Sequence, residues 1–200
     1  MTEKPPPLIL ASRSPRRKIL LRSVGFRVRV VPGRVEERVR LSESPQTNVR
    51  RIALEKALDV ASRRHRGIVV AADTIVVIRG RILEKPKSRS DAMRMLKLLS
   101  GKRHVVFTGF AIVDAATGRS FVGMERTAVT FRKLERAEID AYVASGSPFD
   151  KAGAYGIQDD YGSVFVTRVD GCFYTVVGFP LARFWVELRK FLKRKKNEGT

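Results

Sequence analysis

The chain has 200 residues, 44% of them hydrophobic, which is enough to bury one substantial core in a single domain or in two closely joined lobes. No run approaches the roughly 20 apolar residues of a membrane-spanning helix, one cysteine excludes an internal disulfide, and two histidines argue against a histidine-built zinc site. The net charge of +20 predicts attraction to polyanions, yet the basic residues are spread along the chain without the interleaved aromatic residues of a dedicated nucleic-acid binder. The first seven residues lack an apolar signal-peptide core, which predicts a cytoplasmic protein.

A short strand, a tight turn and a helix are predicted first. Leu8–Leu10 is apolar enough for a central strand, and Ser14 followed by a proline is typical of a helix start. The turn places the Ser12 and Ser14 hydroxyls and the positive end of the helix dipole beside Arg16 and Arg17. These groups predict an anion-binding site; the alternative is a solvated basic helix end.

A lysine interrupts the apolar face of the next predicted helix. A half-exposed strand over 26–31 and a polar loop over 34–46, with Glu37 near its head, lead to a helix over about 48–64. The helical period puts Lys56 in the middle of the apolar stripe of this helix. Its charge needs a buried partner, or the side chain snorkels to the surface.

An aspartate interrupts the most apolar stretch of the chain. The run over 68–78 predicts a strand pair or one long bent strand, broken in the middle by Asp73 and Thr74. A carboxylate there is costly unless it is hydrogen-bonded, metal-bound or directed into a cleft. A hairpin turn then leads to a short strand that ends in the pair Glu84 and Lys85 before a proline.

A glycine-spaced loop over 150–158, ending in Gln158, marks the second half of the chain. Its small residues suggest a backbone that approaches a ligand closely; the alternative is a tight structural turn. The other predicted elements are a helix capped by Ser90 and ending at Gly101, a hairpin of 105–113 and 127–131, a helix over 135–145, short strands over 164–169 and 175–177, and a last helix from Pro180 with a frayed basic tail over 193–200.

The candidate residues together favour phosphate chemistry. Several cations and a few carboxylates, without a candidate thiol or histidine nucleophile, suit a phosphorylated substrate and a hard divalent metal better than acyl transfer. Neither a Walker loop nor a Gly-x-Gly-x-x-Gly motif is present in the sequence, which argues against an ordinary kinase or Rossmann enzyme.

Six short strings, spread in order over nearly the whole chain, resemble the Maf family of nucleoside triphosphate pyrophosphatases. The resemblance implies a cytoplasmic enzyme, often a homodimer, that uses Mg²⁺ or Mn²⁺ to hydrolyse a nucleoside triphosphate to the monophosphate and pyrophosphate. It also implies an α/β fold, a long twisted mixed sheet flanked by helices, in which residues 1–200 form one domain of two lobes around a central cleft, similar to inosine triphosphatases. The strings are Leu-Ala-Ser-x-Ser-Pro-Arg-Arg at 10–17, Ala-Asp-Thr at 72–74, Leu-Glu-Lys-Pro at 83–86, Leu-Ser-Gly at 99–101, Asp-Lys-Ala-Gly-Ala-Tyr-Gly-Ile-Gln at 150–158 and Val-Val-Gly-x-Pro-Leu at 176–181.

The resemblance assigns roles by position. Asp73 matches the general base, and our hypothesis is that Asp73 and Glu37 hold the metal while Lys56 and Lys85 act beside them in catalysis. Arg16, Thr74 and Gln158 match positions linked to the choice of base. The predicted substrate-binding residues are Ser12, Ser14, Arg16, Arg17, Glu37, Thr74, Glu84 and Gln158.

Two of the strings, those at 150–158 and 176–181, resemble the subfamily that acts on dTTP and UTP. The chain departs from the pattern at Phe179, where leucine is usual, and at Asp159, where glycine is usual and where a change could alter base selectivity. The alternatives are a 7-methyl-GTP pyrophosphatase of the same fold, an enzyme for modified pyrimidine triphosphates, and a non-enzymatic nucleic-acid-binding or cell-division regulatory protein. Nucleic-acid binding is compatible with the enzyme but not required by it.

Overall fold

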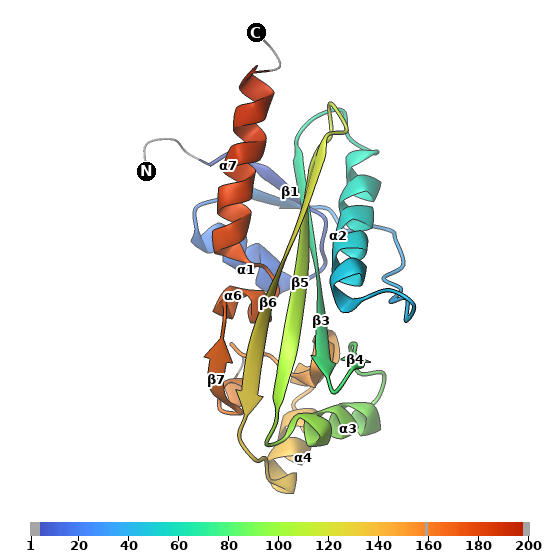
Figure 1. The fold of residues 1–200 in the computed structure, drawn as a ribbon, viewed down its shortest axis with the longest axis vertical. Coiled ribbons are helices and arrows are strands. Elements are labelled where there is room, and N and C mark those ends of the chain that lie inside the picture. Colours follow the sequence, from blue (N-terminus) through green and yellow to red (C-terminus); the bar gives the residue numbers. More distant parts are fainter. Residues whose placement is uncertain (1–4, 159, 198–200) are drawn as a thin grey trace. The chain divides into compact units, whose positions relative to one another are not determined.

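The computed structural model describes residues 5–158 and 160–197, which contain both strands and helices (Figure 1). The strands are β1 (Leu8–Leu10), β2 (Val28–Val30), β3 (Ile68–Ile78), β4 (Arg81–Leu83), β5 (Arg103–Asp114), β6 (Ser120–Phe131) and β7 (Val166–Asp170). The helices are α1 (Pro15–Ser23), α2 (Pro45–Ala61), α3 (Arg89–Leu99), α4 (Arg136–Ala144), α5 (Asp160–Ser163), α6 (Phe173–Val177) and α7 (Leu181–Asn197), with short 3₁₀ turns η1 (Ser147–Asp150) and η2 (Ala152–Ala154).

Within the described residues the strands form one seven-stranded mixed sheet in the order β2-β1-β3-β5-β6-β7, with β4 paired to β3. The strand β1 runs parallel to both β2 and β3, whereas β4 is antiparallel to β3 and β7 is antiparallel to β6. Parallel neighbours need a crossover, and helices α1 and α2 supply the crossovers here. The predicted α/β class with a mixed sheet flanked by helices is confirmed.

The chain divides into two compact units. The first unit contains the chain up to Asp73, Thr108–Glu125 and the chain from Gly178 onward. The second unit contains Thr74–Phe107 and Arg126–Val177. Strands β3, β5 and β6 each contribute residues to both units, so the division falls within strands and not at a linker.

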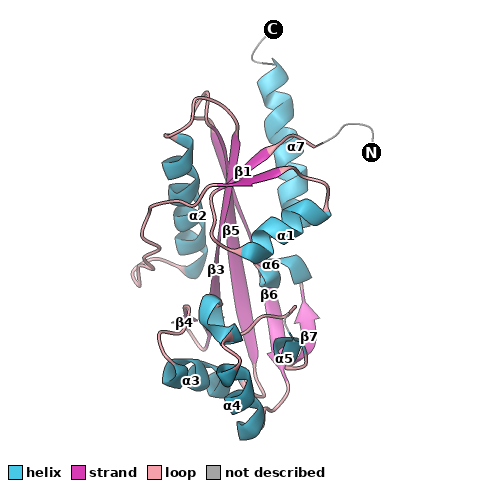
Figure 2. Cartoon of the chain, turned by 180° about the vertical axis from the view of Figure 1, so that it is seen from behind, coloured by secondary structure: helices cyan, strands magenta, loops and turns pink. Residues whose placement is uncertain are grey.

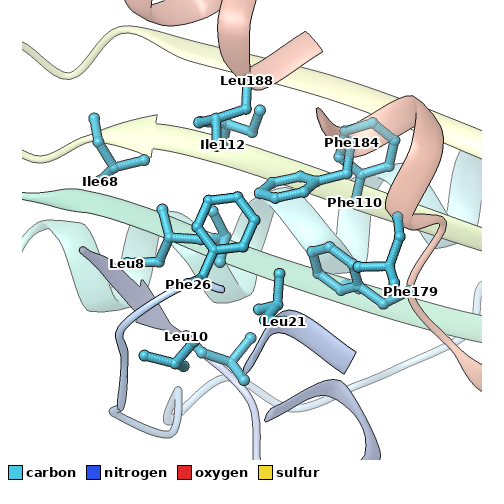
Figure 3. Packing of buried hydrophobic residues seen from close by; sticks show 14 of the residues in the cluster. Leu8, Leu10, Leu21, Phe26, Ile68, Phe110, Ile112, Phe179, Phe184 and Leu188 are labelled. Atoms are coloured by element: carbon cyan, nitrogen blue, oxygen red, sulfur yellow. The ribbon is translucent and has the colours of Figure 1, made fainter. Parts of the chain in front are cut away.

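In the first unit, helices cover both faces of the strands, because successive residues of a strand point to opposite faces. Ile68 and Val70 of β3 pack with residues of α1 and α7, and the intervening Val69 packs with residues of α2 (Figure 1). The core on the α7 side is rich in aromatic rings: Phe26, Phe110 and Phe179 each lie close to Phe184 (Figure 3). Phe179, which differs from the leucine usual in the family pattern, is therefore a fully buried core residue. Its ring centroid lies 4.8 Å from that of Phe184.

Helix α2 lies very close to β5 at Gly109. A side-chain β-carbon at Gly109 would lie 2.3 Å from the Val49 carbonyl oxygen, a separation that only glycine avoids. The residue thereby fixes how closely the helix approaches the sheet. Lys56 follows Val49 by seven residues, about two helical turns, and so lies on the same face of α2.

The second unit packs α3 against α4 (Figure 2) and encloses a group of aromatic side chains. His104, Phe131 and Tyr155 are in mutual ring contact, and Phe165 extends the group toward Tyr142. Among the described residues of the chain, no helix is both long enough and apolar enough to span a membrane.

Several predicted boundaries are wrong for local reasons. Residues 175–177 form part of helix α6 and not a strand, because the Thr175 N–H donates to the Cys172 carbonyl and starts a helical turn. Ser88, not Ser90, caps α3, since its hydroxyl accepts from the Asp91 N–H. Helix α5 was not predicted, and the backbone of α7 continues as helix through Asn197 where a frayed tail was predicted.

Candidate active site

A buried lysine lies between two carboxylates. Asp73 is on the same face of β3 as Val69, which packs with α2, so its side chain points toward this helix. The Lys56 ammonium lies 2.8 Å from Asp73 Oδ1 and 2.9 Å from Glu37 Oε1. Lys56 is 4% exposed, so the snorkelling interpretation is wrong and the buried-partner interpretation is right.

The three side chains come from separate segments. Helix α2 supplies Lys56, strand β3 supplies Asp73, and the irregular loop before α2 supplies Glu37. A buried ammonium is stable only with opposite charges and hydrogen bonds around it. Lys56 has both, and a weaker 3.5 Å contact with the Ala72 carbonyl. Asp73 is buried with it, whereas the Glu37 side chain is 45% exposed and can reach a ligand in solution.

The turn between β1 and α1 is held together by the Ser12 hydroxyl. This oxygen accepts from the Ser14 N–H at 3.1 Å and from Arg17 Nη1 at 3.2 Å. Arg17 Nε also donates to the Gly178 carbonyl at 2.9 Å. Ser14 is the N-cap residue of α1, at the predicted helix start, but its side chain makes no capping hydrogen bond.

Two arginines lie in the first turn of α1, and that turn contains no acidic residue. Arg16 is partly buried. Burial lowers the pKa of the Arg17 guanidinium, and the negative charges of Asp73 and Glu37 oppose that effect. Because a helix N-terminus carries partial positive charge, this turn attracts anions such as phosphate.

The turn and the lysine–carboxylate cluster lie at the same end of a parallel strand pair. Leu10 of β1 is in register with Val70 of β3, and the Ala11 N–H donates to the Val70 carbonyl. Ser12 and Asp73 therefore both follow just beyond the paired residues, on the carboxyl-end side where open α/β sheets bind ligands. The charge interaction of Arg17 with Asp73 agrees with this placement.

The other predicted site residues belong to the second unit. Thr74 follows Asp73 in β3 and is partly buried, whereas Glu84 and Lys85 are exposed directly after β4. Gln158 is exposed at the end of the glycine-spaced loop. Asp159, which stands where glycine is usual in the family pattern, lies outside the described residues.

The glycine-spaced loop is anchored at successive positions within the second unit. The Gly153 N–H donates to the Glu84 carbonyl at 3.1 Å, and the Gly156 N–H donates to Tyr142 Oη at 3.2 Å. Gly153 has a φ of 71° and lies close to the Val76 side chain, so both backbone conformation and space require glycine there. These contacts fix the backbone that presents Gln158.

A buried pair within the second unit, His104 and Tyr155, holds this loop and was not predicted from the sequence. Tyr155 Oη lies 2.8 Å from His104 Nε2, and both side chains are buried. Burial lowers the pKa of His104 to about 4, and burial together with Tyr142 raises the pKa of Tyr155, so both are neutral at pH 7. A lone histidine at the start of a strand gave no signal of this role.

The carboxylates that could hold a divalent cation are Asp73 and Glu37. No group of three or more histidine, cysteine, aspartate or glutamate side chains gathers around one point in residues 5–158 and 160–197. Mg²⁺ usually binds proteins through one or two carboxylates and completes its shell with water and substrate phosphates. Two oxygen-donor side chains beside an anion-binding turn therefore fit such a cation.

The fold and this site define an α/β protein equipped to bind a phosphorylated ligand beside a buried lysine–carboxylate cluster. Residues 7–191 match the family described as Maf-like protein. The chain is 48% identical over 184 residues to a dTTP/UTP pyrophosphatase of Bacillus anthracis, which covers 92% of this chain and 95% of that protein. A dTTP/UTP pyrophosphatase of Bacillus cereus is 49% identical over 184 residues, which are 92% of this chain and 95% of that protein.

The chain therefore belongs to the Maf-like protein family. Among solved structures, the Staphylococcus aureus Ham1 protein is similar with a TM-score of 0.43 and 12% sequence identity, over 62% of this chain and 71% of that one.

Proposed function

We propose that the protein hydrolyses dTTP and UTP to the monophosphate and pyrophosphate. The observation that carries the proposal is the buried Lys56 ammonium between Asp73 and Glu37, beside a turn built to attract anions. Relatives at 48% identity over most of the chain bear the name dTTP/UTP pyrophosphatase, which supports the choice of substrates. House-cleaning of nucleotide pools in the cytoplasm is the corresponding cellular role.

In the first unit, Arg16, Arg17 and Lys56 neutralise triphosphate charge. The Asp73 carboxylate orients a water molecule and takes its proton as the water oxygen bonds to the α-phosphorus. The bond from the α-phosphorus to the bridging oxygen breaks, and pyrophosphate leaves. Asp73 and Glu37, together with phosphate oxygens, would hold a Mg²⁺ or Mn²⁺ ion, which would supply Lewis-acid stabilisation of the developing charge.

Base recognition is assigned to Gln158, with contributions from Thr74 and Arg16. The side-chain amide of glutamine has a carbonyl oxygen that accepts and an NH₂ group that donates hydrogen bonds. It can therefore pair with a donor and an acceptor on the edge of a pyrimidine base. Lys85 and Glu84, which follow β4, contribute charge and hydrogen bonding toward the substrate. These assignments rest on the sequence resemblance and on the anchored loop that presents Gln158. We also propose, on the same resemblance, that the protein forms a homodimer.

The proposal is tested by pyrophosphate release from dTTP, UTP, CTP, 7-methyl-GTP and dATP, with and without Mg²⁺ or Mn²⁺. Metal-dependent release from dTTP and UTP in preference to the others is the expected result. Preference for 7-methyl-GTP would assign the alternative activity of the same fold. Absence of turnover on every triphosphate would contradict the proposal, and steeply salt-dependent binding of polyanions would then support a nucleic-acid-binding role.

A further inference from the structure

The loop that presents Glu37 is irregular, and side chains of α2 bind it at several positions. Residues 31–44 contain no helix or strand. The Arg38 N–H donates to the Glu36 carbonyl at 3.0 Å, which makes a three-residue turn centred on Glu37. Because the Glu37 side chain is half-exposed, burial does not fix its position against Lys56.

Arg51 holds the backbone next to Glu37. Its Nη2 donates to the Arg38 carbonyl at 3.0 Å, one residue beyond Glu37. Its Nε donates to Glu43 Oε2 at 2.9 Å, and its Nη1 donates to Glu55 at 3.2 Å. The rigid guanidinium fork thereby ties the loop to the helix through a carbonyl and a carboxylate.

Asn48 holds the loop two residues further on. Its side chain is fully buried, and its amide binds both backbone groups of Arg40: Oδ1 accepts from the N–H at 2.8 Å and Nδ2 donates to the carbonyl at 2.9 Å. Nδ2 also lies 3.2 Å from the Glu43 carbonyl, and Oδ1 accepts from Arg51 at 2.8 Å. Asn48 and Arg51 therefore act as one connected unit.

The other side of Glu37 is tied to the same helix. The Arg34 N–H donates to Asp59 Oδ2 at 2.9 Å. Thus the loop is fastened before and after Glu37 by residues of α2, which also carries Lys56. A shift of this helix would move Lys56 and the loop together and preserve the contact between Lys56 and Glu37.

We propose that Asn48 and Arg51 are positioning residues of the active site, which hold the loop so that the Glu37 carboxylate stays against Lys56. The inference rests on the proposed function for its catalytic consequence, but the anchoring itself follows from the contacts above. A role limited to stabilising the helix start would make the same hydrogen bonds, so the test must connect these residues to Glu37.

The test uses Arg51→Met and Asn48→Asp, each in the wild-type and in a Glu37→Gln background. Methionine removes the donors of Arg51 and leaves Glu43 and Glu55 accessible to water, so this variant is expected to fold. Aspartate matches asparagine in shape but cannot donate to the Arg40 and Glu43 carbonyls. The matched control is Arg132→Met, because Arg132 likewise binds a carboxylate, Glu138, and a loop carbonyl, that of Val164.

Either variant is expected to lower kcat/KM for dTTP by about 10- to 100-fold, the usual cost of removing a group that orients a site residue. In the Glu37→Gln background the same substitutions should cause no further loss, and Arg132→Met should behave as wild type. Wild-type kcat/KM in both variants, or losses that multiply in the Glu37→Gln background, would overturn the proposal.

Hydrogen exchange of residues 34–43 provides a readout that does not depend on activity. Exchange should be faster in Arg51→Met and Asn48→Asp than in the wild type and in Arg132→Met. If the wild type does not hydrolyse dTTP or UTP, the proposed function fails and this readout alone decides the anchoring: faster exchange supports it, and unchanged exchange overturns it.

Discussion

Replacement of Asp73 by asparagine is expected to lower kcat for dTTP and UTP by about 100- to 10,000-fold, the range typical of lost general-base catalysis. The amide keeps the shape of the carboxylate but cannot take a proton from water. Lys56 retains Glu37 as a partner, so the variant should fold. The measurement is steady-state pyrophosphate release, with circular dichroism as a check on folding.

Asp114→Asn provides the matched control for this prediction. Asp114 is also a buried aspartate of the first unit, and its Oδ1 accepts from the Ala116 N–H in the turn after β5. This variant should retain the kcat of the wild type. If Asp73→Asn also retained it, Asp73 would not be the base.

Replacement of Lys56 by methionine is expected to lower the free energy of unfolding by about 3–5 kcal/mol, the usual cost of removing one partner of a buried ion pair. Methionine fills similar space, but it leaves the buried Asp73 carboxylate without its ammonium. Glu37 contributes less to this cost, because it is half-exposed and can turn to water. Urea unfolding at pH 7 measures the change.

The double variant Lys56→Met/Asp73→Asn separates lost packing from lost charge pairing. Removal of the stranded carboxylate should restore part of the stability, so the double variant should be more stable than Lys56→Met alone. Equal stability of Lys56→Met and the wild type would show that the pair does not stabilise the fold, and additive losses would show that Lys56 and Asp73 act independently.

The two central residues of the site were predictable because each breaks a local rule. Lys56 lies in an apolar helical stripe, and Asp73 lies in an apolar strand. Their pairing was not predictable, since it depends on how closely α2 packs on the sheet at Gly109. The contact of Glu37 depends on a loop without periodicity, which is anchored by side chains that lie 8 to 25 residues further along the chain.

Local signals explain both the correct and the wrong element boundaries. Ser14 and Pro15 predicted the start of α1 correctly, and the same signal at Ser44 and Pro45 starts α2, although the prediction placed that start near Asn48. Asn48 lies within α2, one turn after its start, and its buried side chain binds the preceding loop at Arg40. A buried amide with several loop partners has no sequence signature.

The position of bond cleavage tests the central claim most directly. Hydrolysis of dTTP in water enriched in oxygen-18, followed by mass spectrometry of the products, shows which phosphorus the water attacks. Attack at the α-phosphorus by water positioned by Asp73 predicts label in the thymidine monophosphate and unlabelled pyrophosphate. Label in pyrophosphate would contradict attack at the α-phosphorus, and release of orthophosphate with a nucleoside diphosphate would contradict the proposed function itself.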